Sequence, residues 1–331
     1  HYVSHLKMPA IYYRASKFGP HWGAELRGTH RLSVTWAELV WAAVTVGKPG
    51  VAYLLAHGWH SASDIIVRSH TVYASLRQSG GRIEKSTLYE SLDPTEKGAT
   101  SYFVGMMAAK IIAARLLDTP WLFHLSMFRQ TGGTLQLHSK SEPDLVGLNS
   151  HGNWIILEAK GRTHRSDKKA MAKGKAQTRQ LRRVNGQFPT LRAVIQAHFS
   201  PDLGFSIEDP DDYDENAQDL DFDLAVAMNR YYSGVIPSDK WNREDVKLSG
   251  RKFLVETHDD IGVTVGVDTA ITESWQAVTR TKQAGAASAA IITIEFNGKI
   301  FTVFPDGIVV ALDDRWKENR MMRDPSLRRD D

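Results

Sequence analysis

Two carboxylates and a lysine near the middle of the chain have the types and spacing expected of a metal site. Asp144 follows a proline, and Glu158 and Lys160 end the apolar run of residues 154–157. Carboxylate oxygens are the hard ligands that Mg²⁺ prefers. A cation beside a phosphate generates the attacking nucleophile and neutralises the charge that develops on the phosphoryl group. These residues therefore suit metal-assisted hydrolysis of a phosphate ester.

A β-hairpin would bring these groups together. Residues 144–148 and 154–160 are predicted to be its strands, and residues 149–153, rich in glycine and short polar residues, its turn. A hairpin with this loop places Leu148 opposite Trp154. Both strands are apolar on both faces, which is typical of central strands covered by helices on each side.

The register of this hairpin predicts where the charged groups lie. Counting back from the turn, Asp144 falls opposite Glu158, and directly opposed Cβ atoms lie about 4.5–5.5 Å apart. Side chains alternate along a strand, so Lys160 projects to the same side as Glu158 while Ala159 points to the other. Both carboxylates could then bind one cation, with the lysine beside it.

The pattern Pro143-Asp144 followed by Glu158-Ala159-Lys160 resembles the signature of the PD-(D/E)xK nuclease superfamily. The resemblance implies an α/β fold with a restriction-endonuclease-like αβββαβ core, a mixed central sheet flanked by helices. It also implies one or two Mg²⁺ ions, for which Mn²⁺ can substitute, bound by Asp144, Glu158 and the carbonyl of Ala159. Lys160 would orient or activate the attacking water. The alternative is a surface hairpin with an ordinary Glu-Lys pair.

The helix before the hairpin contains a further acidic candidate. Asp93 suits the N-cap, Pro94 the first helical position, and Glu96 the third, from which its carboxylate can reach the N-cap amide. Because the superfamily often places an acidic residue on this helix, Glu96 is also a candidate catalytic residue. Residues 102–117 are apolar nearly all round with two basic interruptions, which predicts a helix packed on the sheet and not a membrane span.

A basic segment follows the hairpin. Residues 161–183 contain nine basic residues and one acidic residue, and a narrow apolar stripe at helical spacing predicts one helix. Beside a metal site such a helix would bind nucleic-acid phosphates, whereas a solvated charged face is the alternative. The residues assigned to this contact are Lys168, Lys169, Lys173, Lys175, Arg179 and Arg182.

The same helix carries a glutamine candidate, and a strand follows it. Superfamily members commonly have a glutamine on this helix near the site, and Gln177 and Gln180 both fit that position. The sequence leaves the choice between them open. Residues 191–199 are predicted to be the strand that returns to the sheet and completes the core near residue 200.

An acidic segment lies beyond the core. Residues 208–223 contain nine acidic residues and neither Lys nor Arg. Such a block is typical of a solvated, mobile loop. As a hypothesis, it could instead cover the basic surface as a DNA mimic in an inactive state, because its charge complements that of the basic helix.

The flanking regions are predicted with less detail. Residues 1–92 are expected to be mainly helical, with helices near 36–44 and 62–76, and to serve either as a packing layer or as a DNA-reading or partner-binding module. The C-terminal region is expected to combine strands, one helix and a charged tail. The predicted segments are thus 1–92, the nuclease core 93–200, an acidic insertion with a helix at 201–250, and 251–331. The predicted C-terminal elements are strands at 253–267, 291–295 and 299–311, a helix at 272–283 and a tail at 319–331.

Composition excludes some classes of protein. The chain has 331 residues, 42% of them hydrophobic, no cysteine, and a formal net charge of +3. Without cysteine it has no disulfides, thiolate zinc sites or cysteine nucleophiles, which is compatible with the cytoplasm. No signal-peptide pattern or transmembrane run is apparent, so we expect a cytoplasmic protein without a membrane partner.

The expected function is a metal-dependent endonuclease acting on DNA, in bacterial restriction or anti-phage defence. Structure-specific repair, RNA cleavage, and a DNA-binding clamp in a larger complex are the alternatives. The chain has no G-x-x-x-x-G-K-[ST] loop, so an ATPase would be a separate subunit. A recognition subunit or a homodimer is also compatible with cleavage of two strands.

Overall fold

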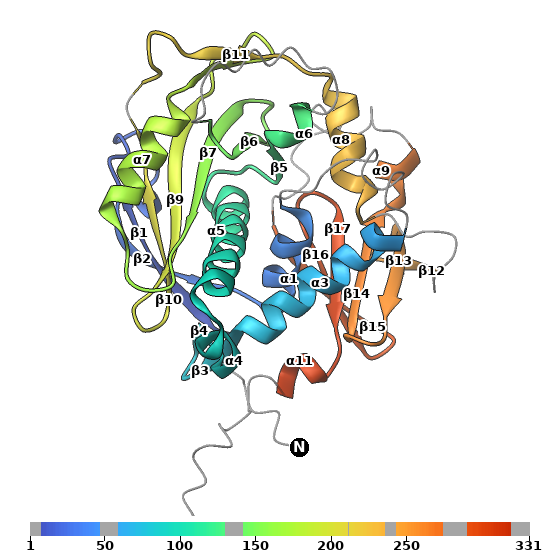
Figure 1. Cartoon of the computed structure of the whole chain (residues 1–331). Helices are drawn as coiled ribbons and strands as arrows, with labels where there is room; N and C mark the ends of the chain where they lie inside the picture. The colour runs from blue at the N-terminus through green and yellow to red at the C-terminus, as the bar shows by residue number, and fades with distance from the viewer. Residues whose placement is uncertain are drawn as a thin grey trace, which may run out of the picture.

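The computed structural model describes an α/β chain built around a mixed central sheet (Figure 1). The described residues are 8–46, 59–129, 142–210, 212–235, 243–273 and 290–318. Within these ranges the central sheet has nine strands in the order β3-β4-β1-β10-β9-β7-β6-β5, with β2 paired to β1. Helices cover both faces of its middle strands.

The middle of this sheet is formed by the segment predicted to be the core. Its main elements run in the order helix, three strands, helix and strand. They are α5 (Pro94–Leu116), β5 (Trp121–His124), β6 (Leu145–Leu148), β7 (Trp154–Gly161), α7 (Lys168–Thr178) and β9 (Leu191–Phe199). Two short elements, α6 (Ser126–Arg129) and β8 (Leu181–Val184), interrupt this series. The predicted strand at residues 191–199 is confirmed as β9.

The hairpin register predicted from the turn length is confirmed. Leu148 pairs with Trp154 and Val146 pairs with Ile156 across β6 and β7. Asn149 N donates to the carbonyl of Asn153 at 2.9 Å and closes the turn. β6 begins one residue later than predicted, so Asp144 stands just before the strand.

Helix α5 begins as its sequence predicts. The Asp93 side chain accepts hydrogen bonds from Thr95 N at 2.6 Å and Glu96 N at 3.2 Å, and Glu96 Oε2 accepts from Asp93 N at 3.3 Å. This capping box satisfies donors that the first turn would otherwise leave open. None of the described helices is long and apolar enough to cross a membrane.

The two main helices approach β7 from opposite faces (Figure 1). A Cβ atom built on Gly105 of α5 would lie 2.6 Å from the carbonyl carbon of Lys160. On the other face, a Cβ on Gly174 of α7 would lie 2.5 Å from the Val194 side chain and 3.2 Å from Glu158 Cγ. Because glycine has no Cβ atom, both helices can pack closely on the strands that carry the charged residues.

The N-terminal region differs from the prediction of a mainly helical segment. The predicted helices are present as α1 (Trp36–Thr45) and α3 (Trp59–Ser75). The same region also supplies strands to the central sheet. Among them, β1 pairs in parallel with β10, which follows the predicted core boundary at residue 200. The central sheet therefore extends beyond the predicted core. These strands are β1 (Ala10–Ser16), β2 (Gly28–Ser33), β3 (Leu76–Ser79), β4 (Arg82–Lys85) and β10 (Leu203–Glu208). Short helices η1 (Ala24–Leu26) and α4 (Thr87–Ser91) lie between them.

Part of the acidic segment lies against the basic one, whereas its charge predicted a loop solvated along its whole length. Its strand β11 (Gln218–Leu220) pairs in parallel with β8, and Asp223 caps α8 (Leu224–Ser233). Asp214 and Asp219 pair with basic residues that follow α7, as described below. The acidic and basic segments attract each other and are joined by a strand pairing, which explains why the acidic segment is held against the basic one.

A second sheet is formed by the C-terminal region. In the described residues it has six strands in the order β12-β13-β14-β17-β16-β15. They are β12 (Arg243–Leu248), β13 (Arg251–His258), β14 (Val263–Asp268), β15 (Ile292–Phe296), β16 (Lys299–Val303) and β17 (Ile308–Leu312). Residues 253–267, predicted as one strand, turn instead at Gly262, whose φ is 64°. Asn297-Gly298, which the sequence favours as a hairpin turn, joins β15 to β16. Asp306-Gly307, another turn sequence, lies between β16 and β17.

The described part of the C-terminal region contains the short helices α9 (Thr269–Glu273) and α11 (Arg315–Glu318). Most of the helix predicted at 272–283, and the tail at 319–331, lie outside the described residues.

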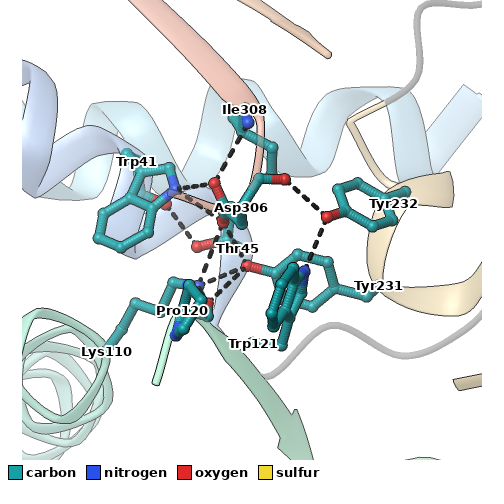
Figure 2. A network of polar contacts seen from close by, with 9 residues as sticks. All are labelled: Trp41, Thr45, Lys110, Pro120, Trp121, Tyr231, Tyr232, Asp306 and Ile308. Carbon is teal, nitrogen blue, oxygen red and sulfur yellow. Dashed lines mark hydrogen bonds and ion pairs between the residues drawn. The ribbon is translucent and has the colours of Figure 1, made fainter. Parts of the chain in front are cut away.

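A buried polar network joins the second sheet to the helices (Figure 2). Lys110 Nζ of α5 lies 3.3 Å from Asp306 Oδ2, in the turn between β16 and β17, and both side chains are fully buried. Asp306 also accepts hydrogen bonds from Trp41 Nε1 at 2.9 Å and from Tyr231 Oη at 2.6 Å. Tyr232 Oη donates to the Asp306 carbonyl at 2.6 Å. One carboxylate thereby contacts α1, α5 and α8.

Candidate active site

Asp144 and Glu158 face each other at the open end of the β6–β7 hairpin. The amide of Asp144 donates to Glu158 Oε2 at 2.8 Å. The amide of Ala159 donates to Asp144 Oδ2 at 3.1 Å. Each acidic side chain is therefore oriented by the backbone of the opposite strand, and the two carboxylates lie where the register places them.

The carbonyl of Ala159 leaves β7 on the same edge as these carboxylates. In an extended strand the N–H and C=O of one residue point to the same side. Because the N–H of Ala159 donates to Asp144, its carbonyl also lies on the Asp144 side of the strand. Two carboxylates and one backbone carbonyl thus gather at one edge of β7, which is the ligand set expected from the sequence.

Lys160 is held between β7 and α7. Its Nζ contacts Glu158 Oε1 and donates to Gln177 Oε1 at 2.8 Å. Gln177 Nε2 in turn donates to the carbonyl of Glu142 at 2.9 Å. The glutamine that reaches the lysine is therefore Gln177. Gln180 lies past the end of α7 and its amide contacts Asp214 instead.

Burial governs the electrostatics of the pair. The Glu158 side chain is 1% exposed, and burial raises the pKa of its carboxyl to about 8. The charge of Asp144 adds to this rise, whereas Lys160 opposes it. A buried carboxyl beside another carboxylate favours either a proton or a cation in its neighbourhood.

A divalent cation fits this donor set. The described residues contain no cluster of three or more His, Cys, Asp and Glu side chains suited to holding a metal ion. A metal here would therefore rest on Asp144, Glu158, the carbonyl of Ala159 and water. Mg²⁺ commonly keeps several of its waters and takes one or two carboxylates from the protein. The two carboxylates that the backbone holds across the open end of the hairpin are the observation that favours a cation.

Glu96 lies elsewhere on α5. Its carboxylate closes the capping box at the first turn of the helix. The α5 residues that reach the site strand come later in the helix, because Gly105 packs on Lys160 and Ser101 packs on Gly161. The structure therefore does not bring Glu96 to the two carboxylates, and its helix cap accounts for its position.

Tyr102 and His124 flank the site and were not among the sequence candidates. Tyr102 Oη lies 3.5 Å from His124 Nε2, and His124 pairs with Leu145, the residue after Asp144. Burial raises the pKa of the Tyr102 phenol to about 12, and the charges of Asp144 and Glu158 contribute to that rise. Neither residue belongs to the E-x-K pattern, and their proximity depends on the packing of α5 over β5 and β7.

The predicted phosphate-binding residues divide into two groups. Lys168, Lys169 and Lys173 are exposed on α7. The other three have carboxylate partners: Lys175 with Glu208 at 3.5 Å, Arg179 with Asp214 at 3.0 Å, and Arg182 with Asp219 at 2.7 Å. The predicted single helix across residues 161–183 is wrong, because α7 ends at Thr178 and Arg182 lies on β8.

No protein-family model, curated protein or solved structure matches the chain. The function is therefore argued from the geometry of the site.

Proposed function

We propose that the chain is a metal-dependent endonuclease that hydrolyses phosphodiester bonds of DNA, with a restriction-endonuclease-like core. Two features carry this proposal. The Asp144 and Glu158 carboxylates are held across the hairpin by the amides of Ala159 and Asp144, respectively. Lys160 is held beside them by Gln177. An ordinary surface Glu-Lys pair would not need a second carboxylate opposite it. Nor would it need a glutamine from another element to position the lysine.

The proposed roles follow from the chemistry of each group. Asp144, Glu158 and the carbonyl of Ala159 would hold Mg²⁺, or Mn²⁺ in its place. When bound, the metal supplies a Lewis acid that polarises the phosphoryl oxygen and lowers the pKa of water. Lys160 contributes a positive charge and a hydrogen-bond donor that orients the attacking water. Gln177 holds Lys160 in place through its side-chain oxygen.

The surroundings suit a polyanionic substrate. Lys168, Lys169 and Lys173 on α7 present exposed positive charge on the helix that also positions Lys160. Lysine contacts to phosphates add affinity without reading sequence, and they weaken with salt. We extend the proposal to restriction or anti-phage defence in the cytoplasm, by analogy with the usual roles of the superfamily that the motif resembles.

Plasmid cleavage tests this proposal. Wild-type protein with Mg²⁺ is expected to nick supercoiled DNA, and Asp144→Ala and Lys160→Ala are each expected to lower the rate by roughly 10²–10⁴-fold. The matched controls are Glu244→Ala and Lys247→Ala, which remove exposed charges of the same types from β12. Both should cleave like wild type.

Equal nicking by wild type and both site variants would mean that the site has been misplaced. A parallel reaction with RNA distinguishes the substrate: faster Mg²⁺-dependent cleavage of RNA than of DNA would replace DNA with RNA in the proposal. Binding of DNA without any cleavage would favour the clamp alternative.

A further inference from the structure

A groove lies on the far side of α7 from the candidate site. It has a volume of about 1040 Å³ and runs between α7 and the open face of β1 and β10. Figure 1 shows these strands beside α7. Its lining has six cationic side chains against two acidic ones. The cationic residues are Arg14, Lys17, Arg82, Lys168, Lys175 and Arg179.

The groove and the candidate site share one face of the central sheet. Lys160 pairs with Gln196, Gln196 with Ser206, and Ser206 with Arg14 across β7, β9, β10 and β1. Residues paired in this way project to the same side. At about 4.8 Å per strand, Arg14 lies about 14 Å from Lys160 along this row. Between them, helix α7 packs on β7 and β9, and Lys169 and Lys173 are exposed on this helix.

An aromatic side chain stands in this groove. Tyr12 is 45% exposed although it lies within a strand, and the Arg82 guanidinium is 5.5 Å from the centre of its ring. Exposed aromatic rings in cationic grooves provide platforms on which nucleic-acid bases stack. The bases of a duplex are already stacked on one another, so this platform suits an unpaired base.

The charges of the groove are only partly balanced from within. Glu208 Oε1 lies 2.6 Å from Lys17 Nζ and 3.5 Å from Lys175 Nζ, so one carboxylate joins the two walls. Arg14 is exposed, and no described carboxylate lies within ion-pair distance of it. Positive charge therefore remains for an anionic ligand. The volume lies slightly above the range of roughly 300–1,000 Å³ typical of small-molecule pockets.

We propose that this groove holds a single strand of nucleic acid that continues from the candidate site over α7. This inference rests on the proposed nuclease function, because it assigns a path to the substrate of that same site. Phosphates contact Arg14 and the lysines of α7, and one base stacks on Tyr12. Cleavage would then occur near an unpaired stretch of the substrate.

Binding in EDTA tests the groove separately from cleavage. The full-length protein is titrated with a labelled single-stranded DNA and with its duplex, and fluorescence anisotropy reports affinity. Tyr12→Ala is expected to weaken single-strand binding by roughly 5- to 100-fold, the range for one stacked base, whereas Tyr12→Phe keeps the ring and stays within about 2-fold. Arg14→Ala removes one phosphate contact. The slope of the logarithm of affinity against the logarithm of salt concentration should therefore become shallower by about 1.

Two further variants sharpen the test. Glu208→Gln should strengthen single-strand binding, because it removes a negative charge shared by Lys17 and Lys175. Arg243→Ala removes an exposed arginine from β12 and should bind like wild type. Thermal melting of each variant shows whether it is folded.

The proposal is overturned if folded Tyr12→Ala and Arg14→Ala both bind the single strand like wild type. It is also overturned if wild type fails to bind single-stranded DNA, or if Tyr12→Ala weakens duplex binding by the same factor. Plasmid nicking reports on the proposed function independently. If Lys160→Ala nicks like wild type while Tyr12→Ala loses single-strand binding, the active-site assignment fails and the groove stands.

Discussion

At the scale of single residues, the site depends on a few reciprocal contacts between two strands. The turn length alone predicted that Asp144 lies opposite Glu158, because the side-chain alternation and the register of a hairpin follow from local rules. The partner of Lys160 could not be obtained in this way. Gln177 and Gln180 are both on the basic segment, and only the packing of α7 on β7 decides which of them reaches the lysine.

The buried carboxyl of Glu158 predicts a pH dependence of stability. Its pKa is about 8 in the folded chain against an ordinary value of 4.5. Between these values the folded protein holds a proton that the unfolded chain has released, so stability should fall as pH rises, by up to about 1.4 kcal/mol per pH unit. Urea unfolding in EDTA between about pH 5 and pH 8 measures this slope.

Glu158→Gln should flatten that slope, and Glu244→Gln, an exposed control on β12, should leave it unchanged. Mg²⁺ should act in the opposite direction to the proton, because it binds the ionised carboxylate. Its stabilising effect is therefore expected to grow with pH. A Glu158→Gln protein that keeps the full wild-type slope would contradict this assignment of the titrating group.

At the scale of elements, the sequence predicts those boundaries that local signals mark. The capping residues before α5 are local and unambiguous, and the helix begins there. The end of α7 was misjudged because the apolar residues of β8 continue the helical spacing by chance. The pairing of β8 with β11, which ends that pattern, joins segments about forty residues apart along the chain. Strand β1 was missed for the same reason, since its partner β10 is remote in sequence.

Two glycines of α5 test the contact between this helix and the site strand. A Cβ on Gly105 would lie 2.6 Å from backbone atoms of Lys160, so Gly105→Ala must move the helix or the strand. We expect a loss of about 1–3 kcal/mol in the free energy of unfolding, together with slower cleavage. Gly98 has open space around it, and Gly98→Ala should add roughly 0.5–1 kcal/mol through helix propensity.

Denaturant unfolding of both variants measures these effects in the same helix. The comparison separates the close approach at Gly105 from the general effect of replacing a helical glycine. If Gly105→Ala is as stable as Gly98→Ala, the contact between α5 and the backbone of Lys160 is looser than the structure has it.

At the scale of the whole molecule, the sequence segments do not correspond to separate cores. One hydrophobic cluster extends from Ile11 in β1 to Trp316 in α11, and it includes the buried faces of α1 and α5. One face of the C-terminal sheet therefore shares its core with the segment that carries the candidate site. The other face forms a smaller cluster of its own, which includes Phe253 and Val309. Composition and local pattern could not show this. The contact between Trp41 and Asp306 joins residues 265 positions apart.

The buried ion pair at this junction gives a test of how the two sheets are joined. Lys110→Met leaves Asp306 buried with only neutral donors, and removing one partner of such a pair typically destabilises a protein by about 3–5 kcal/mol. Lys110→Met combined with Asp306→Asn removes both charges and should recover part of that loss. Unfolding followed by tryptophan fluorescence and by far-ultraviolet circular dichroism measures both variants.

Because Asp306 contacts helices from the rest of the chain, we expect the unfolding transitions seen by the two methods to coincide in wild type and to separate in Lys110→Met. Wild-type stability in Lys110→Met would show that the apolar cluster alone holds the second sheet in place.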